Sequence, residues 1–322
     1  MINLNQLRAF YEVAKSLNFS VAAENLFVTQ PAVTKQIKLF QEFCNLRLFN
    51  RHRGKLFLTD EGKKVFVYTS RIFELERQLE EAISALQNLK QGSLRIGTTK
   101  TYAKNFMPFL LSSFRKMFPE IIFELDEGSS LSMADSLLDF RNSLAIVAKV
   151  EDKSEILFTP LLLEPIVLIA SSHHPLALKS ELNFRDLAGE PFVMKELGSG
   201  TRKLVEQYAR NEKTKLNVIA QTSNMDVIKK LVIQEQAIAF VVKSSVKDEL
   251  SRGDLISLPV YPSGLLTIYI AYLRDYELPF PARAFLDYLL SMANSNDLPV
   301  GTDLIIQKLR NLKKIERNQH AK

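Results

Sequence analysis

The chain has 322 residues, of which 46% are hydrophobic, and a formal net charge of +6. That length can bury substantial cores and suggests two or three domains. No run of about eighteen apolar residues occurs, and Met1 opens without a basic segment or cleavage site, so we expect neither a membrane span nor a signal peptide. Cys44 is the single cysteine, which excludes an intrachain disulfide and favours a reducing, cytoplasmic location.

The positive charge is concentrated at the two ends of the chain. The first 60 residues carry eight Lys/Arg against four Asp/Glu, and residues 303–322 carry six against two. Basic ends on a nearly neutral body suggest a polyanionic partner, although a charge run alone is more often a solvated face.

The first 45 residues contain three short helical patterns. Residues 5–17 place Leu7 and Phe10 on one face at helical spacing, which is typical of a helix packed on a small core. We expect Ser20 to cap a second helix and the Thr29 hydroxyl to cap a third.

The third helix has Pro31 in its first turn, where a missing N–H costs nothing because those donors have no intrahelical partner. Its expected inward face comprises Val33, Ile37, Phe40 and Cys44. Its outward face carries the amides, hydroxyls and cations of Gln30, Thr34, Lys35, Lys38 and Gln41. Such side chains bond to base edges and phosphates when a helix N-terminus enters a major groove. The pattern therefore predicts DNA contact, with an ordinary solvated face as the alternative.

A basic turn between two apolar segments, residues 46–49 and 56–58, predicts a hairpin tipped by Gly54. This wing would place the cations of Arg51, Arg53 and Lys55 beside the third helix. The third helix and the hairpin would both carry groups that bind phosphate, and their proximity strengthens the prediction of a DNA partner.

Residues 1 to about 90 resemble the winged helix-turn-helix of the LysR-type transcriptional regulators. The matching residues are Phe19-Ser20-x-Ala22-Ala23-x-x-Leu26, Thr29-Gln30-Pro31-Ala32-Val33-Thr34-x-Gln36-Ile37, Leu48-Phe49-x-Arg51 and Leu58-Thr59-x-x-Gly62. Where that family usually has Leu, Glu, Leu and Gly, this chain has Phe40, Gln41, Cys44 and Asn45. Asn45 should preserve a left-handed helix end, and Cys44 is interpreted as a small buried apolar residue, with redox sensing as the lesser alternative.

The resemblance implies two groups of DNA-binding residues. The recognition-helix face would consist of Gln30, Pro31, Thr34, Lys35 and Lys38. The wing contacts to the DNA backbone would come from Arg51, Arg53 and Lys55.

From Thr59, an expected N-cap, a helical pattern continues to about residue 90. Its apolar residues recur in steps of three and four, at Val65, Tyr68, Ile72, Leu75, Leu79, Ala82, Leu86 and Leu89. A seam that narrow is typical of a helix that pairs with a second copy, whereas a helix lying on its own domain shows a wider stripe. We therefore predict a homodimer through residues 59–90, followed by a hinge at residues 91–93.

Beyond the hinge, short β-prone runs alternate with helical stretches. The runs are residues 94–97, 121–125, 144–147, 166–169, 192–194, 237–242 and 267–270, and the helical stretches include 105–118 and 201–211. This alternation predicts an α/β domain with largely parallel sheets, in which ligands bind at the carboxyl ends of strands.

The strand-to-helix junctions carry groups suited to an anion. The candidate effector-binding residues are Thr99, Lys100, Thr101, Ser129, Ser130, Ser199, Gly200, Thr201 and Arg202. Glycines let backbone N–H groups converge, a helix N-terminus adds partial positive charge, and Lys100 or Arg202 would pair with a carboxylate or phosphate. These features predict a small anionic effector and no cofactor, although a glycine-serine loop alone is often merely a turn.

This part of the chain is similar to the periplasmic-binding-protein-like effector module of the LysR family, which has two α/β lobes around a cleft. The similarity lies in Leu94-Arg95-Ile96-Gly97, His174-Pro175-Leu176-Ala177, residues 198–202 and Ile238-Ala239-Phe240. It implies that the candidate residues just named, Arg202 excepted, surround the cleft. Ala237 stands where Gly is common in the family.

The sequence gives little support for metal binding or catalysis. His173 and His174 lack neighbouring ligands for a metal and are interpreted as part of a turn before Pro175. Ser199 lacks the Gly-x-Ser-x-Gly context of a nucleophile elbow, and no Walker A or zinc signature occurs. We therefore expect no catalytic residues and no metal site.

The predicted fold is an α+β multi-domain chain. An all-α winged helix-turn-helix at residues 1–58 precedes a dimerisation helix at 59–90, a two-lobed α/β domain at 91–300 and a basic, amphipathic helical tail at 301–322. The predicted function is effector-controlled transcriptional regulation on double-stranded DNA. The resemblance further implies a homotetramer and contact with RNA polymerase. The alternative is a cytoplasmic solute-binding or enzymatic α/β protein with a helical interaction module.

Overall fold

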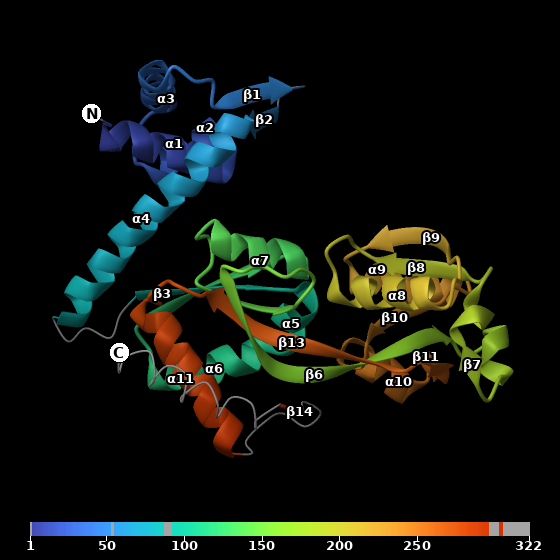
Figure 1. Ribbon diagram of the computed structural model, residues 1–322. Coiled ribbons are helices and arrows are strands. Elements are labelled where there is room, and N and C mark those ends of the chain that lie inside the picture. The colour runs from blue at the N-terminus through green and yellow to red at the C-terminus, as the bar shows by residue number, and fades with distance from the viewer. Residues whose placement is uncertain (1, 53–54, 87–91, 296–302, 305–322) are drawn as a thin grey trace. The chain divides into compact units, whose positions relative to one another are not determined.

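The computed structural model describes residues 2–52, 55–86, 92–295 and 303–304 (Figure 1). Its contacts divide the chain into two compact units, one formed by residues 1–87 with 138–141 and the other by the remaining residues. Within the described ranges, no helix combines the length and the apolar character needed to cross a membrane.

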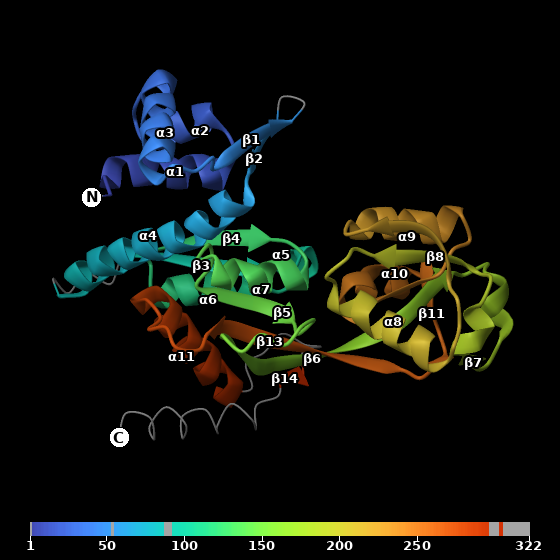
Figure 2. The ribbon, with the colours of Figure 1, turned by 45° about the horizontal axis from the view of Figure 1, so that its top comes forward.

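The N-terminal unit has three short helices, a hairpin and a long helix (Figures 1 and 2). Its elements are α1 (Leu4–Ser16), α2 (Phe19–Asn25), α3 (Gln30–Cys44), β1 (Phe49–His52), β2 (Lys55–Leu58) and α4 (Asp60–Leu86). Phe10 lies at the centre of the core, with its ring centroid 5.5 Å from those of both Phe40 and Phe49. These contacts join α1 to α3 and to the hairpin, and they leave the opposite face of α3 exposed.

Two of the predicted helix caps are wrong in detail. The side chain of Asn18, not that of Ser20, caps α2 by accepting from the N–H groups of Ser20 and Val21. Thr29 does occupy the N-cap position of α3, but its hydroxyl makes no capping hydrogen bond. Asn45 adopts the expected left-handed conformation, with φ 51°.

The start of α4 packs tightly on the strand before it. The Thr59 hydroxyl accepts from the Gly62 N–H at 2.9 Å, which confirms Thr59 as the cap of this helix. Gly62 is required because a Cβ at that position would lie 2.2 Å from the Leu48 carbonyl oxygen. Further along, α4 extends beyond α1–α3 and exposes Tyr68, Ile72, Leu75, Leu79 and Ile83 (Figure 1). The side chains of the predicted seam at Ala82, Leu86 and Leu89 lie outside the described residues.

The second unit is built on an eight-stranded sheet that runs through both of its lobes. The strands are β3 (Gly92–Thr98), β4 (Ile121–Glu127), β5 (Leu144–Ala148), β6 (Ile156–Ser171), β10 (Ala239–Val242), β11 (Leu255–Leu258), β13 (Gly264–Leu273) and β14 (Asp303–Leu304). The order is β10-β6-β13-β5-β3-β4, and β11 and β14 pair with β6.

The prediction of largely parallel sheets is wrong for this sheet. Only β3 pairs in parallel, with β4 and β5, whereas β6 and β13 are antiparallel to each other and to their other neighbours. The chain leaves the first lobe along the 16-residue β6 and returns along β13, so two adjacent strands must run in opposite directions. This crossing pair is visible in Figure 1.

The first lobe covers its sheet with α5 (Lys100–Asn105), α6 (Met107–Met117), α7 (Ser130–Leu138) and α11 (Phe280–Ser295). Its core is centred on Phe114, whose ring contacts Phe285 edge-on at 5.2 Å and Tyr288 at 5.4 Å. The first turn of α5 directly follows the carboxyl end of β3 in the chain.

The second lobe contains a parallel pair, β8 (Pro191–Lys195) and β9 (Asn217–Thr222), with α8 (Gly200–Asn211), α9 (Met225–Gln234) and α10 (Lys247–Arg252). A short pair, β7 (Leu182–Asn183) and β12 (Val260–Tyr261), and the 3-10 turns η1 (Pro175–Leu178), η2 (Phe184–Leu187) and η3 (Lys243–Val246) complete it. The buried Phe184, Phe192 and Phe240 pack together in its core.

The predicted hinge and tail differ from the structure where they are described. Gly92 and Ser93 belong to β3 and pair with β4, so they form part of the sheet and not a hinge. Asp303 and Leu304 pair with β6, which contradicts the predicted helix at these two residues. Residues 87–91 and 305–322 lie outside the described ranges.

Candidate functional site

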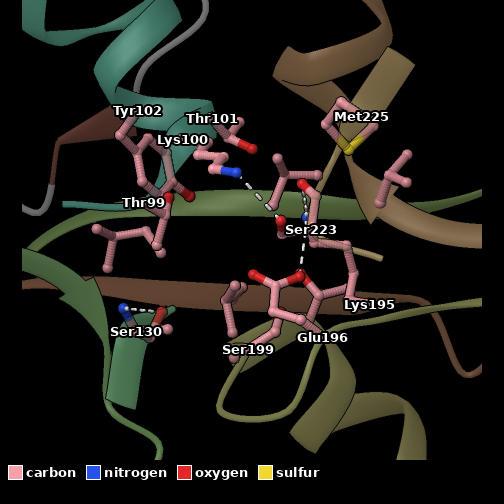
Figure 3. Close-up of a pocket in the computed structure, with 17 residues that line it drawn as sticks. Thr99, Lys100, Thr101, Tyr102, Ser130, Lys195, Glu196, Ser199, Ser223 and Met225 are labelled. Atoms are coloured by element: carbon pink, nitrogen blue, oxygen red, sulfur yellow. Dashed lines mark hydrogen bonds and ion pairs between the residues drawn. The ribbon is translucent and has the colours of Figure 1, made fainter. Parts of the chain in front are cut away.

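A pocket of about 40 Å³ lies where the two lobes of the second unit meet (Figure 3). Its wall comes from the first turn of α5, the end of β8, the first turn of α8, the turn after β9, and β10 and β13. That volume would hold a few water molecules or a compact ligand.

The first turn of α8 lines the pocket, and the first N–H groups of a helix have no intrahelical partner. Ser199 is the N-cap in an extended conformation, and its hydroxyl makes no capping hydrogen bond. Gly200 is necessary for this arrangement because a Cβ there would lie 2.3 Å from the Cβ of Ala148. Gly198 has φ +78°, a conformation that glycine adopts without strain. The partial positive charge of a helix N-terminus therefore faces the pocket.

Two lysines approach the same serine from opposite lobes (Figure 3). Lys100 of α5 donates to the Ser223 hydroxyl at 3.3 Å, and Lys195 of β8 donates to the Ser223 carbonyl at 3.1 Å. Lys195 also lies 3.3 Å from the Glu196 carboxylate. Two cations against one carboxylate, with the α8 N-terminus beside them, make the wall electropositive.

Most of the effector-binding residues expected from the sequence come together here. Those that line the pocket are Thr99, Lys100, Thr101, Ser130, Ser199, Gly200 and Thr201. Ser129 does not line it, because its hydroxyl bonds to Ser132 at the start of α7. Arg202 also lies outside: its guanidinium donates to Glu206, to the Lys195 carbonyl and to Gln221. Arg202 thus connects the first turn of α8 to the ends of β8 and β9.

Four pocket residues with polar side chains were missed in the sequence: Tyr102, Lys195, Glu196 and Ser223. Lys195 and Glu196 directly follow the predicted strand at 192–194, so the rule that ligands bind at carboxyl ends of strands would have found them. Ser223 follows β9, which exposes several of its residues and was not recognised as a strand. Its approach to Lys100, 123 residues away, depends on the way the lobes pack.

A buried carboxyl lies in the strand that crosses between the lobes. Glu164 of β6 is 4% exposed and pairs with Leu266, a pocket residue of β13. Burial raises the pKa of Glu164 above its ordinary value of 4.5, and hydrogen bonds with Ser244 oppose that rise. Burial and the charge of Glu164 raise the pKa of Tyr102, whose hydroxyl has no hydrogen-bond partner in the described part of the chain.

The residues predicted to contact DNA lie at the surface of the N-terminal unit. On α3, the exposed residues are Gln30, Pro31, Thr34, Lys35 and Lys38. Arg51 and Lys55 are exposed on the two strands of the hairpin, and Arg53 lies outside the described residues.

Some of these side chains already have partners within the unit. The Thr34 hydroxyl donates to the Gln30 carbonyl, and Lys38 forms an exposed ion pair with Glu42 at 3.8 Å. The Arg51 guanidinium lies 5.8 Å from the Phe19 ring centroid. An exposed ion pair is worth little, so it would not prevent Lys38 from binding phosphate.

His173 and His174 lie in the turn between β6 and η1. His173 is exposed, whereas His174 is buried and accepts from the Leu176 N–H through Nδ1. Among the described residues, no group of His, Cys, Asp and Glu side chains is arranged to hold a metal ion.

Family models cover both units of the chain. One described as the LysR substrate binding domain matches residues 87–294, and one described as a bacterial regulatory helix-turn-helix protein of the lysR family matches residues 4–63. The chain belongs to the LysR family of transcriptional regulators. It is 34% identical over 289 residues to the HTH-type transcriptional activator CmpR of Synechocystis sp. (strain PCC 6803), a match that covers 89% of this chain and 95% of CmpR.

Two solved structures resemble this LysR-type regulator. The regulatory domain of Synechocystis PCC6803 CcmR, in complex with 2-PG, is 28% identical with a TM-score of 0.60 and covers 65% of this chain and 100% of that one. Full-length CbnR, complexed with its target DNA, is 18% identical with a TM-score of 0.62 and covers 89% of this chain and 99% of that one. The likeness to CbnR shows the shared fold alone.

Membership of the family decides the general function. LysR-type regulators bind DNA and small-molecule effectors and are not enzymes. This protein is therefore a DNA-binding transcriptional regulator with an effector-binding domain, and the alternative of an enzymatic α/β protein is set aside.

The raised pKa of Glu164 predicts a specific pH dependence of stability. The folded protein binds this proton more tightly than the unfolded chain, so the contribution of Glu164 to stability is fully present below pH 4.5 and is lost as pH rises through the folded-state pKa. Glu164→Gln, which has no charge to desolvate, should match the wild type near pH 4 and become progressively more stable than it towards pH 8. Urea unfolding across this pH range measures the difference.

The exposed Glu120 supplies the control for this experiment. Glu120→Gln should give a stability difference from the wild type that does not change with pH in this way. A Glu164→Gln difference that is constant from pH 4 to pH 8 would contradict the prediction.

Proposed function

We propose that this LysR-type regulator is controlled by a small anion bound in the pocket between the lobes. The observation that carries the proposal is the meeting of Lys100, Lys195 and the first turn of α8 around one pocket. Cations and helix N-termini both stabilise carboxylates and phosphates. The binding residues of the proposal are Thr99, Lys100, Thr101, Ser130, Lys195, Ser199, Gly200 and Thr201.

The chemistry of a related regulator supports an anionic effector. The CcmR regulatory domain, 28% identical to this chain, is described in complex with 2-PG, which is 2-phosphoglycolate and carries a phosphate and a carboxylate. In the pocket described here, the hydroxyls of Ser199 and Thr201 and the backbone donors of α8 would take one anionic group. Lys100 and Lys195 would attract the charge, and Glu196 would favour ligands that also present a donor.

The proposed DNA-binding surface consists of the exposed face of α3 and the strands of the hairpin. Gln30 and Thr34 carry groups suited to base edges, and Lys35 and Lys38 carry cations suited to phosphate. Arg51, Arg53 and Lys55 would neutralise the DNA backbone beside them.

A regulator that contacts DNA and RNA polymerase would work in the cytoplasm, where both are found in bacteria.

The proposed homodimer forms through α4. Tyr68, Leu75 and Leu79 are 68%, 58% and 62% exposed, and they recur at coiled-coil spacing. Pairing of α4 with a second copy would bury this stripe and present two α3 helices to DNA.

A further contact between dimers would form a homotetramer. It is favoured by exposed apolar residues on two strands: Ile122 on the edge strand β4, and Val218 and Ile219 on β9.

Control by the effector requires that it bind two arrangements of the lobes with different affinity. Lys100 belongs to the first lobe and Lys195 to the second, so an anion held by both would favour a closed arrangement. The strands β6 and β13 would carry that change across the domain because they run through both lobes.

Removing two cations from α3 tests the DNA-binding surface. Lys35→Ala with Lys38→Ala should weaken binding to all duplexes and lower the slope of log affinity against log salt concentration by about 2, because each phosphate contact contributes about 0.9. Fluorescence anisotropy over a salt series measures both effects. The matched control, Lys104→Ala with Lys116→Ala in the second unit, should retain the wild-type slope, and an unchanged slope in the α3 variant would count against the surface.

Removing one cation from the pocket tests the effector site. Lys100→Ala should weaken binding of 2-phosphoglycolate or inorganic phosphate, measured by titration calorimetry, by about tenfold or more, because a hydrogen bond to a charged group is worth ~1.5–3 kcal/mol. Lys104→Ala, on the same short helix but outside the pocket lining, is the control. Wild-type affinity in the Lys100 variant would refute this role for Lys100.

Placing charge in the seam of α4 tests the dimer. Leu75→Glu with Leu79→Glu should raise the dimer dissociation constant by more than ~100-fold, because unpaired carboxylates would be buried in the interface. Sedimentation equilibrium measures the constant. Lys64→Glu, an exposed change outside the seam, should leave it unaltered. A seam variant that remains dimeric at wild-type concentrations would contradict pairing through α4.

A further inference from the structure

Phe27, in the turn between α2 and α3, combines two unfavourable features. Its side chain is 97% exposed, and its backbone has φ +54°, a conformation that bulky residues rarely adopt. Other apolar residues at positive φ are better covered: Leu17 is 42% exposed and Phe140 is 9% exposed. A single exposed apolar residue needs no explanation, but exposure together with backbone strain does.

The backbone around Phe27 shows why strain arises there. The Val28 N–H donates to the Ala23 carbonyl at 3.0 Å, and the Phe27 N–H donates to the Glu24 carbonyl at 3.1 Å. These two bonds define a Schellman motif that ends α2, and Phe27 occupies the left-handed position where glycine or asparagine is preferred. The turn itself is therefore well made, and the strain comes from the side chain placed in it.

Four other left-handed helix ends carry more suitable residues, whereas α1 ends at the half-covered Leu17. Asn45 ends α3 and Gly253 ends α10, each with the same pair of backbone bonds. Lys213 and Gln236, which follow α8 and α9, place polar side chains in solvent. Phe27 departs from these four residues because it places a 97% exposed aromatic ring at a left-handed position.

The position of Phe27 points to the surface that it serves. Residues 27–31 are all exposed, and this stretch continues directly into the exposed face of α3. Phe27 is three residues before Gln30, the first residue of that helix, so the two Cα atoms are at most about 11 Å apart. A ligand bound along the first turn of α3 would therefore meet the Phe27 ring.

We propose that Phe27 is a specificity-determining DNA contact that packs against the C5-methyl group of a thymine at the edge of the major groove. The inference rests on the DNA-binding surface proposed above. A phenyl ring has no strong donor or acceptor to offer a phosphate, and the thymine methyl is the apolar group that the major groove presents. Binding buries the ring and this methyl together, which compensates for leaving both exposed in the free molecules.

The test is a double-mutant cycle between the ring and the methyl group, using the full-length protein. The DNA is a duplex selected from random sequences by the wild-type protein, with each thymine replaced in turn by uracil, which lacks only the methyl. At one thymine in each half-site, uracil should weaken wild-type binding about fourfold, the value expected for one buried methyl. Phe27→Asn should weaken binding to the thymine duplex and be insensitive to uracil at that position.

The melting temperature distinguishes a DNA contact from a structural role. If Phe27 stabilised the fold, its replacement would lower the melting temperature. Asparagine tolerates the left-handed conformation, so Phe27→Asn should raise the melting temperature of the N-terminal unit by ~3 °C while DNA binding falls. Gln236→Asn changes another residue at positive φ, in the second unit, without a change of charge. This control should keep wild-type DNA affinity and wild-type sensitivity to uracil.

Three outcomes would overturn the inference. Wild-type affinity in Phe27→Asn would show that the ring is not a contact. Weakened binding with unchanged sensitivity to uracil at every thymine would show that the ring contacts something other than a methyl. If the wild-type protein selects no sequence and its binding does not depend on salt, the proposed DNA-binding surface itself fails, and this inference fails with it.

Discussion

The pairing of β6 with β13 is the interaction on which the effector domain depends. The two strands are in register from Ile156 with Leu273 to Ile166 with Gly264, apart from one shift between Ile268 and Tyr269. Backbone hydrogen bonds along this length join the lobes into one sheet, so the position of one lobe constrains the other. The pocket exists because this pairing brings the first turns of α5 and α8 together.

The pocket has two lysines in its wall, and a buried carboxyl lies in the neighbouring strand. Lys100 and Lys195 reach its wall, whereas Glu164 lies behind it in the crossing strand, where burial favours its protonated form. A raised pKa makes protonation of Glu164 easier, and protonation reduces the negative charge that this carboxyl adds near the lysines and the α8 N-terminus.

The N-terminal unit follows a different constraint, the packing of aromatic rings around Phe10. Because Val33, Ile37 and Phe40 are buried against this core, the opposite face of α3 must carry its polar residues outwards. The position of that face follows from helical periodicity. The exposure of the Phe27 ring does not follow from periodicity. It depends on the left-handed backbone conformation of the turn between α2 and α3, which only the structure shows.

The sequence alone determined the elements whose signals are local. Helical spacing located α1, α3 and α4, Asn45 marked a left-handed helix end, and the glycine-rich junction marked the first turn of α8, because each depends on residues close together in the chain. Only the tertiary structure decided that β6 and β13 pair antiparallel, that Arg202 lies outside the pocket lining and that Lys100 donates to Ser223. These features depend on contacts between segments far apart in the chain, and local pattern carries no information about which distant partner a strand or a side chain will meet.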